Sequence, residues 1–169
     1  MIILKSTIEL NNWFIENLNG LVENVGFVPT MGALHMGHAS LIEKASSECQ
    51  IVVVSILVNP TQFNEKADLQ SYPRNFDNDV IVAEKAGGTI LFTPTPKDIY
   101  GGTPYAEPVD YGPITSAFEG LSRQGHFDGV VSVVDKLFIA VKPNRAYFGS
   151  KDLQQVAVVE RMSNERHPK

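Results

Sequence analysis

Two histidines three positions apart, His35 and His38, stand in the segment VPTMGALHMGH at residues 28–38. The apolar residues before this segment indicate a buried strand, which Pro29 and Gly32 are expected to end. The residues after it carry apolar side chains at helical spacing, so both histidines should lie at a helix start. Free backbone N–H groups and the positive end of the helix dipole attract anions there. We interpret the segment as a turn that binds the phosphates of a nucleotide.

A pair of histidines can also serve structure alone or bind a metal ion. A zinc site would need at least one more ligand. Cys49 is the only cysteine, and the remaining histidines, His126 and His167, lie far along the chain. Metal binding by the pair is therefore disfavoured, and we predict no metal site on the protein.

Polar side chains follow two further predicted strands. Asn59 and Gln62 come after an apolar run, and Pro60 should hold Asn59 extended, which leaves two amides at the edge of the sheet. Neutral amides can bind hydroxyls and carboxylates alike, although an Asn-Pro turn without a ligand is the alternative. Ser150 is a candidate N-cap, which would place Lys151 in a first helical turn, where a cation is unfavourable. Lys151 is thus either a solvated surface lysine or a ligand of a bound anion.

The composition favours one folded domain over residues 1–169. With 43% hydrophobic content, the chain can bury one core but has little left for a second. Its net charge of −5 argues against nucleic acid or an acidic membrane as a partner. The N-terminus MIILKSTIEL lacks the pattern of a signal peptide, and no run of about 18 apolar residues is present. We expect a cytoplasmic protein.

Strands and helices are predicted to alternate along the chain. The run IVVVSILV from Ile51 is apolar on both faces, as in an inner parallel strand covered by helices. These patterns predict an α/β fold with a doubly wound parallel sheet, whose ligands lie beyond the carboxyl ends of the strands. We expect strands at residues 25–28, 51–58, 89–92 and 146–148, and helices at residues 37–48, 76–86, 130–141 and 151–162.

Two further segments complete this description. Ser6 and Glu9 are spaced as a capping box for a first helix through Leu18, which Asn19 and Gly20 should stop. Residues 93–113 hold five of the ten prolines, so we expect a long, partly ordered excursion there.

The segments VPTMGALHMGH, VNPTQF, YPR, SRQGHFDGV and FGSKDLQQ occur in this order over nearly the whole chain. Together they resemble the pantothenate synthetases, the pantoate-beta-alanine ligases of vitamin B5 and coenzyme A biosynthesis. The H-x-G-H element alone is shared with nucleotidylyl transferases and class I aminoacyl-tRNA synthetases. The resemblance implies a Rossmann-like sheet of the nucleotidylyl transferase type. It also implies ATP-driven condensation of pantoate with β-alanine through a pantoyl adenylate, releasing AMP and pyrophosphate, in a cytoplasmic homodimer that uses Mg²⁺.

The resemblance also assigns roles to individual residues. It places His38 at the family's catalytic histidine, and His35 and Lys151 can join His38 in offsetting charge on the phosphate oxygens. Gln62 and Gln155 match the glutamines that bind pantoate, and Gln62 also lies toward β-alanine. Arg123 and His126 lie in a family-typical stretch without an assigned role. The implied ATP ligands are Met31, Gly32, Ala33, Leu34, His35, Met36, Gly37, His38, Gly149, Ser150, Lys151 and Asp152, of which Asp152 is a partner for the ribose and Ser150 stands where many members carry Glu.

Two alternatives remain open on the sequence alone. Another H-x-G-H nucleotidylyl transferase would use the same turn but would not need two glutamines. A catalytically inactive fragment that binds ATP or pantoate is the second alternative, because the family pattern continues after Lys169 with a Ser-Ser-Arg-type ATP loop and a smaller C-terminal domain. We expect residues 1–169 to fold as the N-terminal domain without that C-terminal domain.

Overall fold

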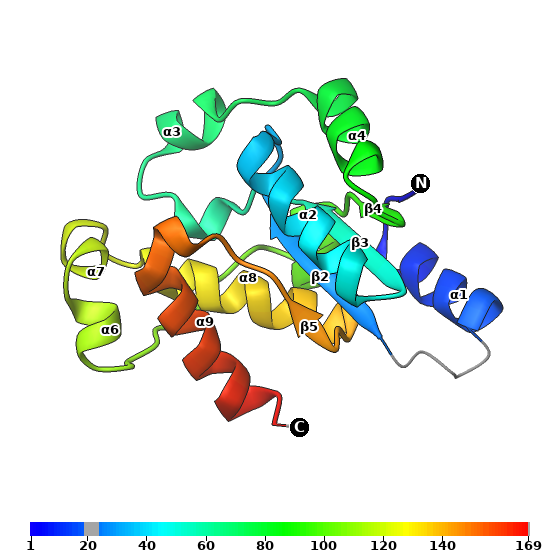
Figure 1. Cartoon of the computed structure of the whole chain (residues 1–169). Coiled ribbons are helices and arrows are strands. Elements are labelled where there is room, and N and C mark those ends of the chain that lie inside the picture. Colours follow the sequence, from blue (N-terminus) through cyan, green and yellow to red (C-terminus); the bar gives the residue numbers. More distant parts are fainter. Residues whose placement is uncertain (19–23, 169) are drawn as a thin grey trace.

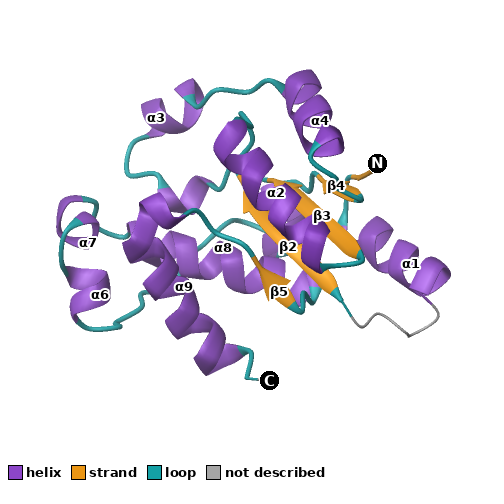
Figure 2. Cartoon of the chain, in the orientation of Figure 1, coloured by secondary structure: helices purple, strands orange, loops and turns teal. Residues whose placement is uncertain are grey.

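A computed structural model describes residues 1–18 and 24–168 of the protein, and its centre is a sheet of five parallel strands. The order of the strands across the sheet is β1-β4-β3-β2-β5 (Figures 1 and 2). The chain therefore moves from β2 outward through β3 to β4, and returns to the other side of β2 for β5. This confirms the predicted Rossmann-like, doubly wound sheet. The strands are β1 (Ile2–Leu4), β2 (Val25–Thr30), β3 (Ile51–Ile56), β4 (Ile90–Phe92) and β5 (Arg145–Ala146).

Helices cover both faces of this sheet (Figure 2). The long helix α8 packs with α1 and α9 on one face, and α2 packs with α4 on the other. The helices are α1 (Thr7–Leu18), α2 (Met36–Glu48), α3 (Lys66–Ser71), α4 (Phe76–Lys85), α5 (Pro96–Tyr100), α6 (Pro113–Ser116), α7 (Glu119–Ser122), α8 (His126–Val141) and α9 (Leu153–Arg166), with short 3₁₀ turns η1 (Pro60–Gln62) and η2 (Ser150–Asp152).

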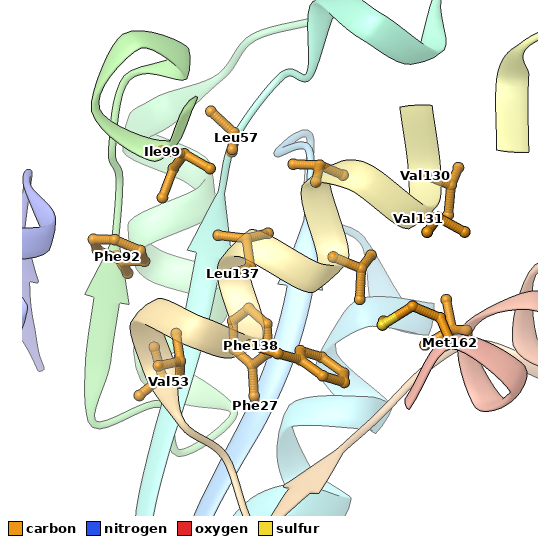
Figure 3. Packing of buried hydrophobic residues seen from close by; sticks show 14 of the residues in the cluster. Phe27, Val53, Leu57, Phe92, Ile99, Val130, Val131, Leu137, Phe138 and Met162 are labelled. Atoms are coloured by element: carbon orange, nitrogen blue, oxygen red, sulfur yellow. The ribbon is translucent and has the colours of Figure 1, made fainter. Parts of the chain in front are cut away.

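Alternation along β3 explains why a run of apolar residues forms its inner strand. Val53 faces α8, whereas Val52 and Val54 face α2 and α4. Side chains of a strand point alternately to the two faces, so a strand covered on both sides is apolar throughout. On the α8 side Phe27 meets Phe138 edge to face, with ring centroids 6.2 Å apart (Figure 3). The sheet is therefore fixed from both faces, and its carboxyl ends form a rigid edge.

The predicted strands are present, with differences at their ends. Strand β2 continues through Pro29, which the sequence predicted would end it. The Phe27 carbonyl accepts a hydrogen bond from the Tyr147 N–H, on the β5 side of β2. Backbone groups two residues apart on a strand point to the same side, so the Pro29 nitrogen also faces that side, beyond the last residue of β5. No ladder bond is lost there, so the proline is tolerated. The edge strand β1 was missed because three residues are too few to show a period, and β5 lies at Arg145–Ala146 rather than at residues 146–148.

Two helix boundaries also differ from the predictions. Helix α8 begins at His126, four residues before the predicted start, and α9 spans Leu153–Arg166 instead of residues 151–162. Ser6 caps α1 through the Glu9 N–H at 3.1 Å, as predicted, although the Glu9 carboxylate bonds the N–H of Lys5 instead of the cap residue. The predicted stop at Asn19 and Gly20 falls outside the described residues.

The proline-rich residues 93–113 contain the short helix α5 and otherwise little regular structure, as expected. They are fastened to α8: the Val109 N–H donates to Asp128 at 3.0 Å, and the Tyr105 carbonyl accepts from Ser132 at 3.2 Å. This excursion therefore lies along α8.

Candidate active site

A cleft of about 690 Å³ opens at the carboxyl ends of β2, β3 and β5. The fold explains its position, because α2 follows β2 on one face of the sheet and α9 follows β5 on the other, and ligands of open α/β sheets bind at such a switch point. Most of the predicted site residues line it, although they come from three separate turns. These are Met31, Gly32, Ala33, His35, Gly37, His38, Gln62, Gly149, Ser150, Lys151, Asp152 and Gln155.

Two of the predicted ATP ligands do not line the cleft. The Leu34 side chain is buried in the core on the α2 side, and Met36 is 81% exposed to solvent. Motif matching selects both because they lie between residues that do face the cleft. Any contact from Leu34 would have to come from its backbone.

Both histidines occupy the start of α2, as their spacing predicted. His35 is the N-cap residue, and its Nδ1 accepts a hydrogen bond from the Gly37 N–H at 3.0 Å. The His35 N–H donates in turn to Nδ1 of His38 at 3.3 Å, which closes a reciprocal capping box. Since Nδ1 accepts in both rings, a neutral ring carries its proton on Nε2. Each neutral histidine therefore has an Nε2–H group to offer a ligand.

The pKa of His38 shows which form this donor takes. Burial lowers the pKa of His38 below its ordinary value of 6.5, and His35 and Lys151 lower it further, whereas Asp79 opposes the change. His38 is thus mostly neutral at pH 7. This modifies the expectation that His38 supplies positive charge, because in the absence of ligand it supplies a hydrogen-bond donor instead.

The turn before the histidines depends on Asp79, a residue that sequence analysis missed. Asp79 is 2% exposed and lies on α4, and its carboxylate accepts from the Ala33 N–H at 3.0 Å and the Leu34 N–H at 2.6 Å. Ala33 has a φ of 52° and Gly32 a φ of 86°, so two successive residues adopt left-handed backbone. A buried carboxylate bonded to two backbone N–H groups stabilises this turn from outside. Asp79 lies in the first turn of a predicted helix, where an acidic residue is common, so the sequence gave no signal of this distant contact.

Lys151 lies across the cleft in η2, and here the predicted cap is wrong. Gly149 occupies the N-cap position of η2 and Ser150 lies inside the turn, while Asp152 precedes α9. The chain makes a 3₁₀ turn before the helix, so Lys151 is outside α9. Its side chain is exposed, and none of the ion pairs found within residues 1–18 and 24–168 includes it. Lys151 is therefore a cation that a ligand can pair with.

Buried hydrogen bonds orient the amide of Gln62. Asn59 is 1% exposed and its Oδ1 accepts from the Thr61 N–H at 3.4 Å, while its Nδ2 donates to the Gly129 carbonyl at 3.1 Å. These two backbone partners fix which end of the Asn59 amide is nitrogen. The same Nδ2 donates to Oε1 of Gln62 at 3.1 Å, so Nε2 of Gln62 points toward Met31, 3.1 Å from its sulfur. Because Gln62 lines the cleft, the amide offers it N–H groups.

The second glutamine, Gln155, also lines the cleft, from the first turn of α9. Its neighbour Gln154 points elsewhere: it accepts from the Glu119 N–H at 3.1 Å and donates to the carbonyls of Ile114 and Ala117. The two adjacent glutamines therefore differ in role, one tying α9 to α6 and α7 and one facing the cleft.

The remaining wall of the cleft is apolar and comes from α8. Val130, Val133, Val134 and Leu137 line it, with Tyr72 and Pro73 opposite the sheet. The motif YPR had marked the last two residues without giving them a role. The sequence did not predict this role for the valines, because their spacing is typical of the buried face of a helix.

Two negative observations apply to the described residues. In residues 1–18 and 24–168 there is no group of three or more His, Cys, Asp or Glu side chains placed to hold a metal ion. None of the helices in those residues is long and apolar enough to cross a membrane.

A sheet of five parallel strands with an H-x-G-H helix start at its switch point defines a Rossmann-like α/β domain. Within that class, the chain belongs to the pantoate-beta-alanine ligase family, whose model matches residues 2–168. Similar curated proteins are the pantothenate synthetases of Bacteroides fragilis, 50% identical over 83% of this chain and 49% of the relative, and of Porphyromonas gingivalis, 46% identical over 97% and 58%.

Solved structures agree with this assignment. A pantoate-beta-alanine ligase from Francisella tularensis, solved in complex with beta-gamma ATP and beta-alanine, superposes with a TM-score of 0.90 at 42% identity, over 98% of this chain and 62% of that one. A pantothenate synthetase from Thermus thermophilus gives a TM-score of 0.87 at 43% identity, over 98% and 58%. The chain spans about half the length of the curated relatives it matches, and the rest of those relatives has no counterpart in these 169 residues.

Proposed function

We propose that the cleft binds ATP and pantoate and takes part in the ATP-dependent condensation of pantoate with β-alanine, which yields pantothenate, AMP and pyrophosphate. The observation that carries this proposal is the convergence of three turns on one cleft: the paired histidines, the Lys151 turn and the two glutamines. Family membership favours this ligase chemistry over that of another H-x-G-H nucleotidylyl transferase. The product would enter coenzyme A biosynthesis.

The nucleotide half of the site would be the edge between β2 and β5. At the start of α2, where the positive end of the helix dipole favours anions, His35 and His38 would supply Nε2–H donors. Lys151 would add the positive charge, and Asp152, which also lines the cleft, would accept from ribose hydroxyls. In-line attack on the α-phosphorus increases charge on the phosphate oxygens, and these preorganised donors would stabilise that charge.

The acid half would be the edge between β2 and β3. Pantoate has a carboxylate and two hydroxyls, which Gln62 and Gln155 can bind, and two methyl groups on one carbon, which suit the valine wall of α8. Held there, the carboxylate oxygen attacks the α-phosphorus and pyrophosphate leaves, which gives pantoyl adenylate. The β-alanine amine then attacks the acyl carbon and AMP leaves, so no protein nucleophile is needed. Gln62 is also the proposed contact for β-alanine.

Three finer features belong to the same proposal. Mg²⁺ would enter with ATP, coordinated mainly by phosphate oxygens as it usually is in such sites. The proposed assembly is a homodimer, and the proposed compartment is the cytoplasm. The complex of the Francisella tularensis ligase with beta-gamma ATP and beta-alanine supports the two ligands.

Calorimetric titration tests the binding proposal on this chain, with ATP and pantoate added singly and together. We expect weak binding of both to this chain. In the chain extended by the C-terminal part that its relatives carry, we expect exchange of labelled pyrophosphate into ATP that requires pantoate. His38→Ala should lower that exchange by roughly a hundredfold, as loss of a preorganised donor does, with little change in melting temperature. An exchange rate near that of the wild type in His38→Ala would remove His38 from the mechanism. Absence of pantoate binding at millimolar concentration would refute the site assignment.

A further inference from the structure

His126 contacts the candidate site from behind, although it does not line the cleft. It is the first residue of α8 and is 5% exposed. Its Nδ1 lies 3.2 Å from the backbone carbonyl oxygen of Gln62, and its Nε2 lies 3.3 Å from a guanidinium nitrogen of Arg123. A buried imidazole is therefore bonded to the residue that carries the proposed pantoate amide.

The two partners of this imidazole determine where its proton sits. A carbonyl oxygen only accepts, so Nδ1 has to be the donor in that bond. A guanidinium only donates, so Nε2 has to be the acceptor. The neutral Nδ1–H tautomer satisfies both bonds, whereas the Nε2–H tautomer satisfies neither. An imidazolium keeps the bond to Gln62 but sets an N–H group and a positive charge against Arg123.

Burial, together with Arg123, favours the neutral form of His126 over the opposing carboxylates. Burial lowers the pKa of His126 below its ordinary value of 6.5, the bond to the Gln62 carbonyl opposes this, and Arg123 lowers the pKa further. Glu119 and Asp152 also face the ring and raise its pKa. Arg123 is held in place by Glu119, 3.1 Å away.

The position of Gln62 is sensitive to this contact because the backbones are packed closely. A Cβ atom on Gly129, one turn along α8, would lie 2.5 Å from the Thr61 carbonyl oxygen and 2.6 Å from the Gln62 nitrogen. The start of α8 thus presses directly on η1. His126 sets the carbonyl of Gln62 while Asn59 sets its side chain, so both ends of the residue are fixed from below the cleft.

We propose that His126 is a positioning residue for pantoate binding, acting through Gln62 as the neutral Nδ1–H tautomer that the Arg123 guanidinium selects. The link to pantoate rests on the proposed function, whereas the tautomer and its effect on Gln62 do not. Acidification converts the ring to the imidazolium, breaks the contact with Arg123 and loosens the start of α8 against η1.

The first experiment needs no ligand. Nitrogen-15 labelled histidine, observed by two-bond correlation NMR above pH 7, should show His126 with a protonated Nδ1 and a bare Nε2. The side-chain amide signals of Gln62 should shift as His126 titrates. Arg123→Met, which keeps the stem and removes the donor, should reduce the preference for this tautomer. An Nε2–H tautomer, or Gln62 signals that ignore the titration, would overturn the inference whatever the protein binds.

The second experiment measures pantoate affinity in variants of His126. An asparagine amide nitrogen can occupy the place of Nδ1, so His126→Asn should keep affinity within about twofold and lose the pH dependence, whereas His126→Leu should lose roughly tenfold, the value of one such hydrogen bond. His167→Asn is the matched control, since His167 bonds Asp135 away from the cleft.

The outcomes separate the two proposals. If the tautomer is as stated but the wild-type chain binds no pantoate, the proposed function fails and the positioning of Gln62 stands. If pantoate binds and both His126 variants bind it equally well, the function stands and the positioning role is refuted. If His126→Leu folds poorly, the tautomer observed by NMR and the pantoate affinity of His126→Asn still test the positioning role.

Discussion

The turn after β2 and the turn after β3 leave neighbouring strands of one sheet but are stabilised by different means. Residues 31–38 turn the Nε2 side of the His35 and His38 rings toward the cleft, and the turn is held by short-range caps and by the buried carboxylate of Asp79. Residues 59–62 are held by a buried network that joins Asn59, Tyr100, Gly129 and His126. An anion site must keep its donors free for the ligand, whereas an amide that binds a small acid needs a fixed orientation. The first turn is therefore open and the second is enclosed.

The strongest test of this difference disrupts the packing of the second turn, residues 59–62, against α8. Gly129→Ala places a methyl group 2.5 Å from the Thr61 carbonyl oxygen, and backbone on both sides prevents relief. We expect the free energy of unfolding to fall by about 3 kcal/mol, the upper end of overpacking costs. Urea denaturation measures this. Gly102→Ala, where an added methyl group meets nothing within 4 Å, is the control, and an equal loss in both would contradict the close approach.

The matching test on the first turn removes the Asp79 carboxylate, which bonds it from α4. Asp79→Ala leaves the N–H groups of Ala33 and Leu34 without their acceptor, so we expect a loss of about 2 kcal/mol in stability and weaker ATP binding. Asp77→Ala, exposed in the first turn of the same helix, should change the unfolding free energy by only a few tenths of a kcal/mol. Unchanged ATP affinity in Asp79→Ala would show that the turn keeps its shape without the carboxylate.

The same contrast explains what the sequence could and could not predict. The capping box at His35 and His38 spans three residues, so the sequence pattern contained all of it. The contact of Asp79 with Leu34 spans 45 positions, and that of Asn59 with Gly129 spans 70, so sequence could select Asn59 but could not find its partner. The doubly wound sheet was predictable because the inner strand β3 is covered on both faces and is therefore apolar throughout, whereas the helices repeat apolar side chains at helical spacing. Strand β1 and the 3₁₀ turn before α9 were not, because they are too short to show one.

A smaller effect distinguishes substrate-binding amides from structural ones. Gln62→Ala and Gln155→Ala should each lower pantoate affinity roughly tenfold, because a polar group of the bound acid loses its partner. ATP affinity should change much less. Gln154→Ala removes bonds to α6 and α7 instead and should lower stability while leaving pantoate affinity near the wild-type value. Calorimetry with both ligands checks this, and equal losses for ATP and pantoate would indicate general damage.

The smallest expected effect compares the histidines of the two turns. Burial lowers the pKa of both His38 and His126 below the ordinary value of 6.5. A base with a lowered pKa binds fewer protons in the folded chain than in the unfolded one, so stability is complete above pH 6.5 and falls as the pH drops toward the folded pKa. Replacing either histidine with a residue that does not titrate should flatten this part of the stability curve.

ATP binding should change the pKa of His38 but not that of His126. Bound phosphates favour a protonated His38, because an anion beside the ring stabilises its charged form, and the pKa of His38 should rise. His126 faces the Gln62 carbonyl and Arg123 from behind the cleft, and its pKa should remain nearly constant. An NMR titration of labelled histidine with and without ATP measures both at once. If the two pKa values rose together, the phosphate charge would be reaching the enclosed turn as well, and the division into an open anion site and an enclosed amide site would be wrong.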